Sequence, residues 1–260
     1  GRSALDYLIK VKGYSFLEAV ETIIGHTAIQ APVYEKPQAK EENKPLLLPE
    51  KCVSNRVITE YLFGRGIDFE IINYCISNDL IFESLPYHNV VFVGYDEKKE
   101  PKYAAYRSTN KRRIMGDCSG SKKDYSFRLG KENLEEVHLF ECAIDLLSYA
   151  TLAKLNGQDW KEMSFVSLSG VYSPAKKIED SKVPIALEKY LGSNPSVRKI
   201  RIHFDNDIAG RKAAQTLKTI LPDKYEIVDE PPKAGKDFND FLCMRMGIYN
   251  KKTHERNEER

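Results

Sequence analysis

Three acidic residues in the second half of the chain are placed where they could act together on one ligand. Glu141 ends the apolar segment VHLFE, and Asp205 and Asp207 follow the apolar segment KIRIHF. Because residues i and i+2 of a strand point to the same side, the two aspartates are expected to present both carboxylates at one spot. Such a cluster of anions is tolerated when a cation lies among them, and oxygen ligands favour a hard divalent ion, Mg²⁺ first. The spacing predicts a cation site suited to displacement reactions at phosphorus.

Each of these carboxylates also has a purely structural interpretation. Asp207 precedes a predicted helix and can act as its N-cap alone. Glu141 can simply favour the N-terminus of its own following helix through the helix dipole. The functional interpretation gains from the combination, because Asp145 lies one helical turn beyond Glu141 and because the buried segment RIHF leads directly into Asp-x-Asp followed by Ala-Gly.

These acids must be positioned by a regular alternation of strands and helices, which begins near residue 137. Strands that alternate with helices of this length predict crossover connections and a parallel sheet. The carboxyl ends of parallel strands meet at one edge, where ligands bind, so Glu141 is expected beside the aspartates. The predicted strands are 137–141, 164–170, 199–204 and 225–228, and the predicted helices are 142–155, 184–192, 207–221 and 237–246.

The first half of the chain shows other patterns. Residues 3–24 predict two short helices, and 54–81 are helical again, with two apolar stripes. Residues 90–93 and 102–107 predict the two strands of a hairpin. The proline-rich, charged segment between the helical parts predicts a linker. We therefore expect a helical segment at 1–26, a linker at 27–50, a smaller α+β part at 51–131, the α/β domain at 132–245 and a solvated tail at 246–260.

Positive charge is concentrated just before the α/β region. Residues 98–131 contain eleven Lys or Arg and three Asp or Glu, a net charge of +8, whereas the whole chain carries +2. Aromatic residues are interleaved with these cations, a combination that suits a phosphate backbone and stacked bases. The alternative is a solubilising loop surface.

Composition excludes several classes of protein. No run approaches the length of a membrane span, and no secretory leader opens the chain. The five cysteines are widely spaced, with no Cys-x-x-Cys pair, and the five histidines show no ligand pattern, so neither a disulfide scaffold nor a cysteine-rich zinc site is expected. Cys142 is interpreted as a small buried residue, not a nucleophile. We expect a cytoplasmic protein with reduced thiols, and because the chain begins with Gly1 we expect it to be part of a longer protein.

The segments FECAID, SLSG, HFDNDIAGRKAA and GKDFNDFL together resemble the Toprim fold in the form found in bacterial DnaG-type primases. The resemblance covers about residues 137–243 and implies a Toprim-type parallel sheet flanked by helices, preceded by a smaller α+β basic subdomain. The chain departs from the family pattern at Cys142 and Asn206 and in the loop SGVYSP, and none of these changes removes a carboxylate. The matching positions are Glu141, Asp145, Asp205, Asp207, Ala209, Gly210, Lys236 and Asp237.

The resemblance also implies roles for these residues. Glu141 is expected to do acid/base work and, with Asp205 and Asp207, to form the catalytic group. Mg²⁺, with Mn²⁺ as an alternative, is expected on Glu141, Asp145, Asp205, Asp207 and Asp237. Nucleic acid or nucleotide is expected on Lys102, Arg107, Arg112, Arg113, Lys122, Lys123, Arg128 and Lys236.

Upstream segments extend the resemblance. The hairpin 88–107 is similar to the segment that precedes Toprim in primases, and to a domain paired with Toprim in proteins of mobile elements from Gram-positive bacteria. Residues 1–25 resemble the stretch that follows the primase zinc ribbon. The zinc ligands are therefore expected before this chain, and no zinc is expected within it.

Three functions remain open at this point. The first is a primase-like nucleotidyltransferase acting on single-stranded DNA and nucleoside triphosphates, in DNA replication or mobile-element transfer. The second is a Toprim nuclease, and the third is a non-catalytic single-strand-binding module of a mobilisation protein. A helicase or a relaxase is the expected protein partner, and no membrane partner is expected.

Overall fold

The structure, a computed structural model, describes residues 4–12, 14, 19, 22, 44–110, 112–170, 172, 174–175 and 177–248. The chain divides into two compact units, residues 1–43 and 44–260. In the first unit, helix α1 (Ala4–Lys10) lies where the first short helix is predicted. Of the second short helix only Ala19 and Thr22 are described, both of them helical, and most of the predicted linker falls outside the described residues. Residues 44–50 belong to the larger unit, where the Leu47 N–H donates to the Ser119 carbonyl at 2.9 Å.

The larger unit begins with two helices and an antiparallel sheet of four strands in the order β1-β2-β3-β4. The predicted hairpin is confirmed, because β2 and β3 pair with Phe92 opposite Ala105. The short strands β1 and β4 extend the hairpin on either side. The elements are α3 (Arg56–Phe63), α4 (Phe69–Ser77), β1 (Ile81–Glu83), β2 (Val90–Tyr95), β3 (Pro101–Arg107) and β4 (Met115–Asp117).

A second sheet has five strands in the order β5-β7-β6-β8-β9. Four of them are parallel, and the edge strand β5 is antiparallel to β7. The parallel arrangement is the one that the alternating pattern predicts. The strands are β5 (Arg128–Gly130), β6 (Glu136–Phe140), β7 (Ser164–Ser167), β8 (Lys199–Ile202) and β9 (Glu226–Asp229).

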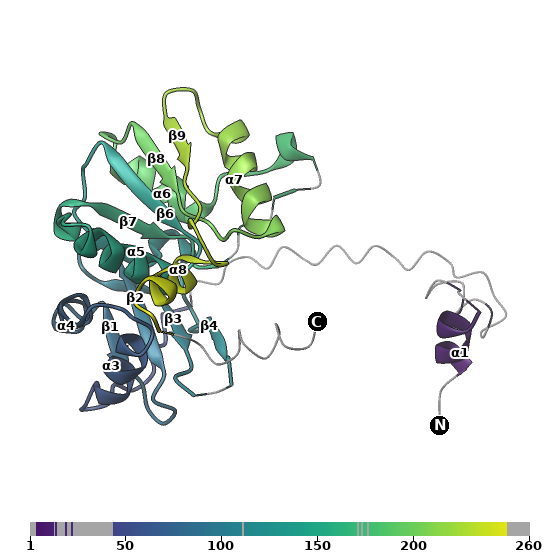
Figure 1. The fold of residues 1–260 in the computed structure, drawn as a ribbon, viewed down its shortest axis with the longest axis horizontal. Coiled ribbons are helices and arrows are strands. Elements are labelled where there is room, and N and C mark those ends of the chain that lie inside the picture. Colours follow the sequence, from purple (N-terminus) through teal and green to yellow (C-terminus); the bar gives the residue numbers. More distant parts are fainter. Residues whose placement is uncertain are drawn as a thin grey trace. The chain divides into compact units, whose positions relative to one another are not determined.

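Helices cover both faces of this second sheet (Figure 1). One core joins α5 and α8 to α3, α4 and one face of the sheet, and a separate core joins α6 and α7 to the other face. The predicted α/β class, with a smaller α+β part before it, is confirmed. The helices are α5 (Ala143–Leu155), α6 (Ile185–Ser193), α7 (Ile208–Ile220) and α8 (Phe238–Arg245), with short 3₁₀ turns at Lys123–Tyr125, Trp160–Glu162 and Ile178–Asp180.

Buried aromatic side chains tie the smaller part to the α/β part. Trp160, in the 3₁₀ turn before β7, is 2% exposed and meets Tyr74 of α4 edge-on, with ring centroids 5.0 Å apart. Phe127 packs in the same way against Phe92 of β2, at 5.5 Å. Within the described residues, no helix combines the length and the apolar character needed to cross a membrane.

Candidate metal centre

Glu141 and Asp205 lie side by side because their strands are neighbours. Leu139 of β6 pairs with Ile202 of β8 in parallel register, so the two strands end together at one edge of the sheet. Just beyond that edge, the backbone N–H of Asp205 donates to Oε1 of Glu141 at 3.2 Å. The structure thus brings together the acids that the sequence places at the ends of these two strands.

Glu141 is a strongly perturbed carboxyl group. The residue is 5% exposed. Its pKa is raised to about 7, first because burial penalises the charged form and then because Asp205 and Asp207 are close, while the Asp205 N–H and Lys236 oppose the shift. A carboxylate in such surroundings is ionised near neutral pH only at a free-energy cost, which a bound cation would remove.

Lys236 bridges the two aspartates after β8. Its Nζ lies 3.0 Å from Oδ2 of Asp205 and 3.2 Å from Oδ2 of Asp207. The pKa of Lys236 is raised by these two carboxylates, Asp205 first. The pKa of Asp207 is lowered, chiefly by the hydrogen bond that its Oδ1 accepts from the Gly210 N–H at 2.9 Å and then by Lys236. One oxygen of Asp207 therefore caps α7, and the other faces positive charge.

Two residues of the first turns of α7 fix the backbone under the acids. A Cβ on Gly210 would lie 2.2 Å from the Asp205 carbonyl oxygen and 3.0 Å from Oε1 of Glu141, so only glycine allows this close approach. Arg211 donates to the carbonyl oxygens of Asp205 and Phe204 and pairs with Asp229 at the end of β9 at 2.7 Å. Sequence reasoning did not single out Arg211, although its place directly after Ala-Gly was visible.

Asp145 and Asp237 lie deeper behind this edge. Asp145 is 6% exposed, and its oxygens accept from the Cys142 thiol at 2.8 Å and from the Asn239 N–H at 3.2 Å. Burial raises the pKa of both acids, and the charge of Asp205 raises both further. Asp237 also caps α8, since its Oδ1 accepts from the Asp240 N–H at 2.7 Å. Asp205 is therefore linked electrostatically to Glu141, Asp145 and Asp237.

The donor set fits a hard divalent cation. The site offers carboxylate oxygens, which are the ligands that hard cations prefer. Two of these oxygens already contact the ammonium group of Lys236, so they lie close enough together to share one positive charge. The acids are spread more widely than a compact ligand shell. In the part of the chain that the structure describes, the only trio of His, Cys, Asp or Glu with ligand atoms all within 4.8 Å of one another is Cys52, Glu83 and His88.

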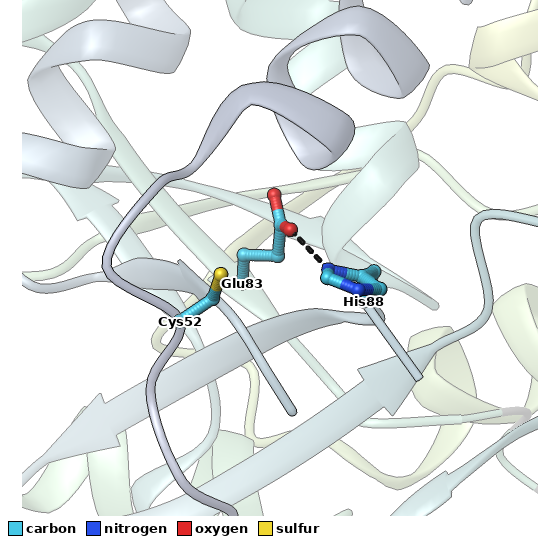
Figure 2. A group of neighbouring side chains, drawn as sticks. All are labelled: Cys52, Glu83 and His88. Carbon is cyan, nitrogen blue, oxygen red and sulfur yellow. Dashed lines mark hydrogen bonds and ion pairs between the residues drawn. The ribbon is translucent and has the colours of Figure 1, made fainter. Parts of the chain in front are cut away.

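That trio was not predicted from the sequence, in which the histidines show no ligand pattern. Glu83 and His88 are five residues apart, but Cys52 lies far from them in the sequence, so the spacing along the chain does not reveal the trio (Figure 2).

Besides Lys236, two of the predicted basic residues lie beside the acidic edge. Arg107, at the end of β3, donates to Tyr61 Oη at 3.1 Å and lines a cavity of about 280 Å³ that reaches Cys142, the residue after Glu141. Aromatic side chains, including Tyr106 and Phe92, line the same cavity. Lys123 pairs with Asp117 at 3.0 Å and approaches the Ser169 carbonyl oxygen, in the loop after β7, at 3.5 Å.

Other predicted basic residues lie elsewhere. Lys102 is paired with Glu100 and Asp96 in the hairpin turn. Arg128 of β5 is mostly buried, stacks on Tyr190 with 5.2 Å between its Cζ and the ring centroid, and has a lowered pKa because of burial. The structure does not bring these two to the acidic edge. Arg112, Arg113 and Lys122 lie on loops that flank β4, and all three are exposed.

Two family models match the larger unit. The model described as "Protein of unknown function (DUF3991)" matches residues 60–133, and the model described as Toprim-like matches residues 138–242. The predicted Toprim resemblance is confirmed, and the second sheet with its helices is a Toprim-like domain. No curated protein sequence matches the chain.

Solved structures with similar folds include several primases. The primase fragment of the bacteriophage T7 primase-helicase protein is 18% identical, with a TM-score of 0.48, over 74% of this chain and 72% of that chain. The E. coli primase catalytic core is 12% identical, with a TM-score of 0.47, over 78% and 72%. The zinc-binding and RNA polymerase domains of the Aquifex aeolicus primase are 15% identical, with a TM-score of 0.47, over 95% and 68%.

Proposed function

We propose that this chain is a primase-like nucleotidyltransferase that joins ribonucleotides on a single-stranded DNA template. The observation that carries the proposal is the meeting of Glu141 with Asp205 at the carboxyl edge of a Toprim-like sheet, beside a cavity lined by Arg107 of the preceding basic sheet. An anionic site that attracts cations and a neighbouring cationic surface are the two parts that a template-directed enzyme needs.

Asp205, Asp207 and Glu141 are the residues that would hold Mg²⁺, or Mn²⁺ in its place. Asp145 and Asp237 would support them from behind with their negative charge. When bound, the ion stabilises charge on the attacking and leaving oxygens of an in-line displacement at phosphorus.

The chain's own residues supply the proton acceptor and the phosphate contacts. In the proposed reaction, the 3′-hydroxyl oxygen forms a bond to the α-phosphorus, the bond between that phosphorus and the bridging oxygen breaks, and pyrophosphate leaves. Glu141, which lies against the Asp205 backbone at the same edge, accepts the hydroxyl proton. Lys236 and Arg107 are placed to neutralise and orient the phosphate oxygens.

The proposal extends to the protein's surroundings. The loop residues Arg112, Arg113 and Lys122 would hold the phosphate backbone of the template, and Lys123 would act closer to the acidic edge. DNA replication or mobile-element transfer in the cytoplasm is the proposed context, with a helicase or a relaxase as partner.

An assay with three possible products tests the proposal. The protein is incubated with single-stranded DNA, Mg²⁺ or Mn²⁺, and labelled ribonucleoside triphosphates. We expect labelled oligomers, which Asp205→Asn and Glu141→Gln abolish and the exposed control Asp223→Asn preserves. Shortened DNA would indicate a nuclease instead, and a mobility shift with neither product would indicate a binding module. Wild-type turnover in either active-site variant would overturn the site assignment.

A further inference from the structure

We infer that Cys52, Glu83 and His88 form a second metal site, one that takes a borderline ion of the Zn²⁺ class. One ligand atom from each residue lies within 4.8 Å of the other two, and Nδ1 of His88 lies 2.5 Å from Oε1 of Glu83 (Figure 2). The site shares no residue with the acidic edge of the Toprim-like sheet, and it does not depend on the proposed function.

The donor chemistry sets the class of ion. A thiol, an imidazole and a carboxylate are the three ligand types of protein zinc sites, and three protein ligands leave a fourth tetrahedral position for water. Mg²⁺ avoids sulfur and nitrogen, so it does not suit this trio. With a thiolate, a carboxylate and a neutral imidazole, the site would carry no net charge once a divalent ion is bound.

The distances are close to those of a closed site. Bonds of about 2.0–2.3 Å around a tetrahedral ion place the ligand atoms roughly 3.3–3.7 Å apart. The carboxylate and imidazole must therefore separate by about 1 Å, and the thiol must move inward by about 1 Å at most. Side-chain rotations supply such movements, and the His88 side chain, 45% exposed, leaves a path for the ion.

The backbone at all three ligands is held in place without an ion. The Cys52 N–H donates to the Glu83 carbonyl at 2.8 Å, next to the bridge between Lys51 and Ser84. The His88 N–H donates to the Ser84 carbonyl at 2.8 Å, and the His88 carbonyl accepts from Thr109 Oγ1 at 2.9 Å. Preorganised ligands bind a metal without the cost of ordering a loop.

Glu83 is oriented by an outer shell, as metal-ligating carboxylates are. Its Oε2 accepts from the backbone N–H groups of Val57 and Ile58 at the start of α3, at 2.9 and 3.3 Å. This leaves Oε1 directed toward the imidazole and the thiol. A helix cap and an ion pair explain Glu83 and His88, but neither of them accounts for the thiol of Cys52 in the same group.

The test uses cobalt as a spectroscopic probe and zinc content as the second measurement. The full chain is stripped with a chelator, loaded with Co²⁺ and read for the sulfur-to-cobalt charge-transfer band. We expect one equivalent and a band that Cys52→Ser abolishes. The matched control is Cys118→Ser, since Cys118 is also partly exposed and lies next to β4 of the same sheet. That variant keeps the band.

Zinc affinity then separates this site from the acidic edge. Cys52→Ser and His88→Ala should each lower it by more than the roughly 10–100-fold typical of losing an outer-shell partner. Asp205→Asn should leave both the band and the zinc content unchanged, whatever it does to nucleotidyl transfer. A cobalt or zinc signal that does not depend on Cys52, or zinc content at background in the wild type, would overturn the inference.

Discussion

Replacing Glu141 by glutamine should stabilise the protein above neutral pH, because at that pH the buried carboxyl group is ionised at a free-energy cost. The pKa of Glu141 rises from its ordinary value of 4.5 to about 7 on folding, chiefly through burial. A raised pKa in an acid means that the folded state binds the proton more tightly. The charge of Glu141 therefore destabilises the fold increasingly as pH rises from 4.5 through 7, whereas below 4.5 it has no effect.

The magnitude follows from linkage. A shift of this size corresponds to about 3 kcal/mol at pH 8 and to less than about 1 kcal/mol at pH 5. The substitution removes this cost, while the side-chain carbonyl of the introduced glutamine can still accept from the Asp205 N–H. In a unit of this size, the gain at pH 8 amounts to roughly 6–12 °C in Tm.

The measurement is urea unfolding of wild type and Glu141→Gln at pH 5 and pH 8 in a chelator, with Asp223→Asn as the exposed control. We expect a gain in the free energy of unfolding at pH 8 that nearly vanishes at pH 5 and is absent in the control. Mg²⁺ should reproduce the gain in the wild type alone. A variant no more stable than wild type at pH 8 would refute the electrostatic argument for the site.

Three further substitutions test other parts of the site. Gly210→Ala should destabilise the fold by about 1–3 kcal/mol in urea unfolding and displace Asp205, because the added Cβ would lie 2.2 Å from the Asp205 carbonyl oxygen. The control is Gly192→Ala, at a helical glycine with open space around it, which should stabilise the fold by about 0.5–1 kcal/mol. Equal effects of the two substitutions would contradict the close approach at Gly210. Arg107→Ala should weaken binding of single-stranded DNA and reduce the salt slope by about 1, and an unchanged affinity across a salt series would remove Arg107 from the interface. Lys236→Met should tighten Mn²⁺ binding about two- to fivefold in calorimetry, because the lysine competes with the ion for the same carboxylate oxygens. The same substitution should lower turnover. Weaker Mn²⁺ binding would show that Lys236 does not compete with the ion.

The parallel sheet and its acidic edge could be predicted because, in an α/β protein, local sequence patterns mark the strands and helices whose connections determine the sheet. Each strand from 137 onward is an apolar run and each helix a longer periodic one, and the crossover rule then fixes where strand ends meet. The pairing of Leu139 with Ile202 is the consequence that places Glu141 beside Asp205. The residue types at that edge supplied the rest of the prediction.

Short elements and contacts between distant segments could not be predicted from the sequence. Strands β1, β4 and β5 have three residues each, too few to show a period of two. The trio of Cys52, Glu83 and His88 depends on the bridge between the segment at Lys51 and β1, and no local pattern encodes that pairing. Lys236 was predicted to contact nucleotide, but its position between two aspartates depends on the loop that follows β9.

The structural and functional interpretations of Asp207 turn out to be compatible, and this explains why sequence alone left them open. An aspartate has two oxygens, and Asp207 uses Oδ1 to cap α7 and directs Oδ2 at the Lys236 ammonium. Because the cap lowers the pKa of Asp207, this carboxylate stays ionised at the edge where Glu141 resists ionisation. Under the proposed function, the capped Asp207 supplies negative charge for the cation, and Glu141 is the carboxyl group that exchanges a proton. Replacing Asp207 by asparagine should separate the two roles, since its amide oxygen can still cap the helix while the site loses one negative charge.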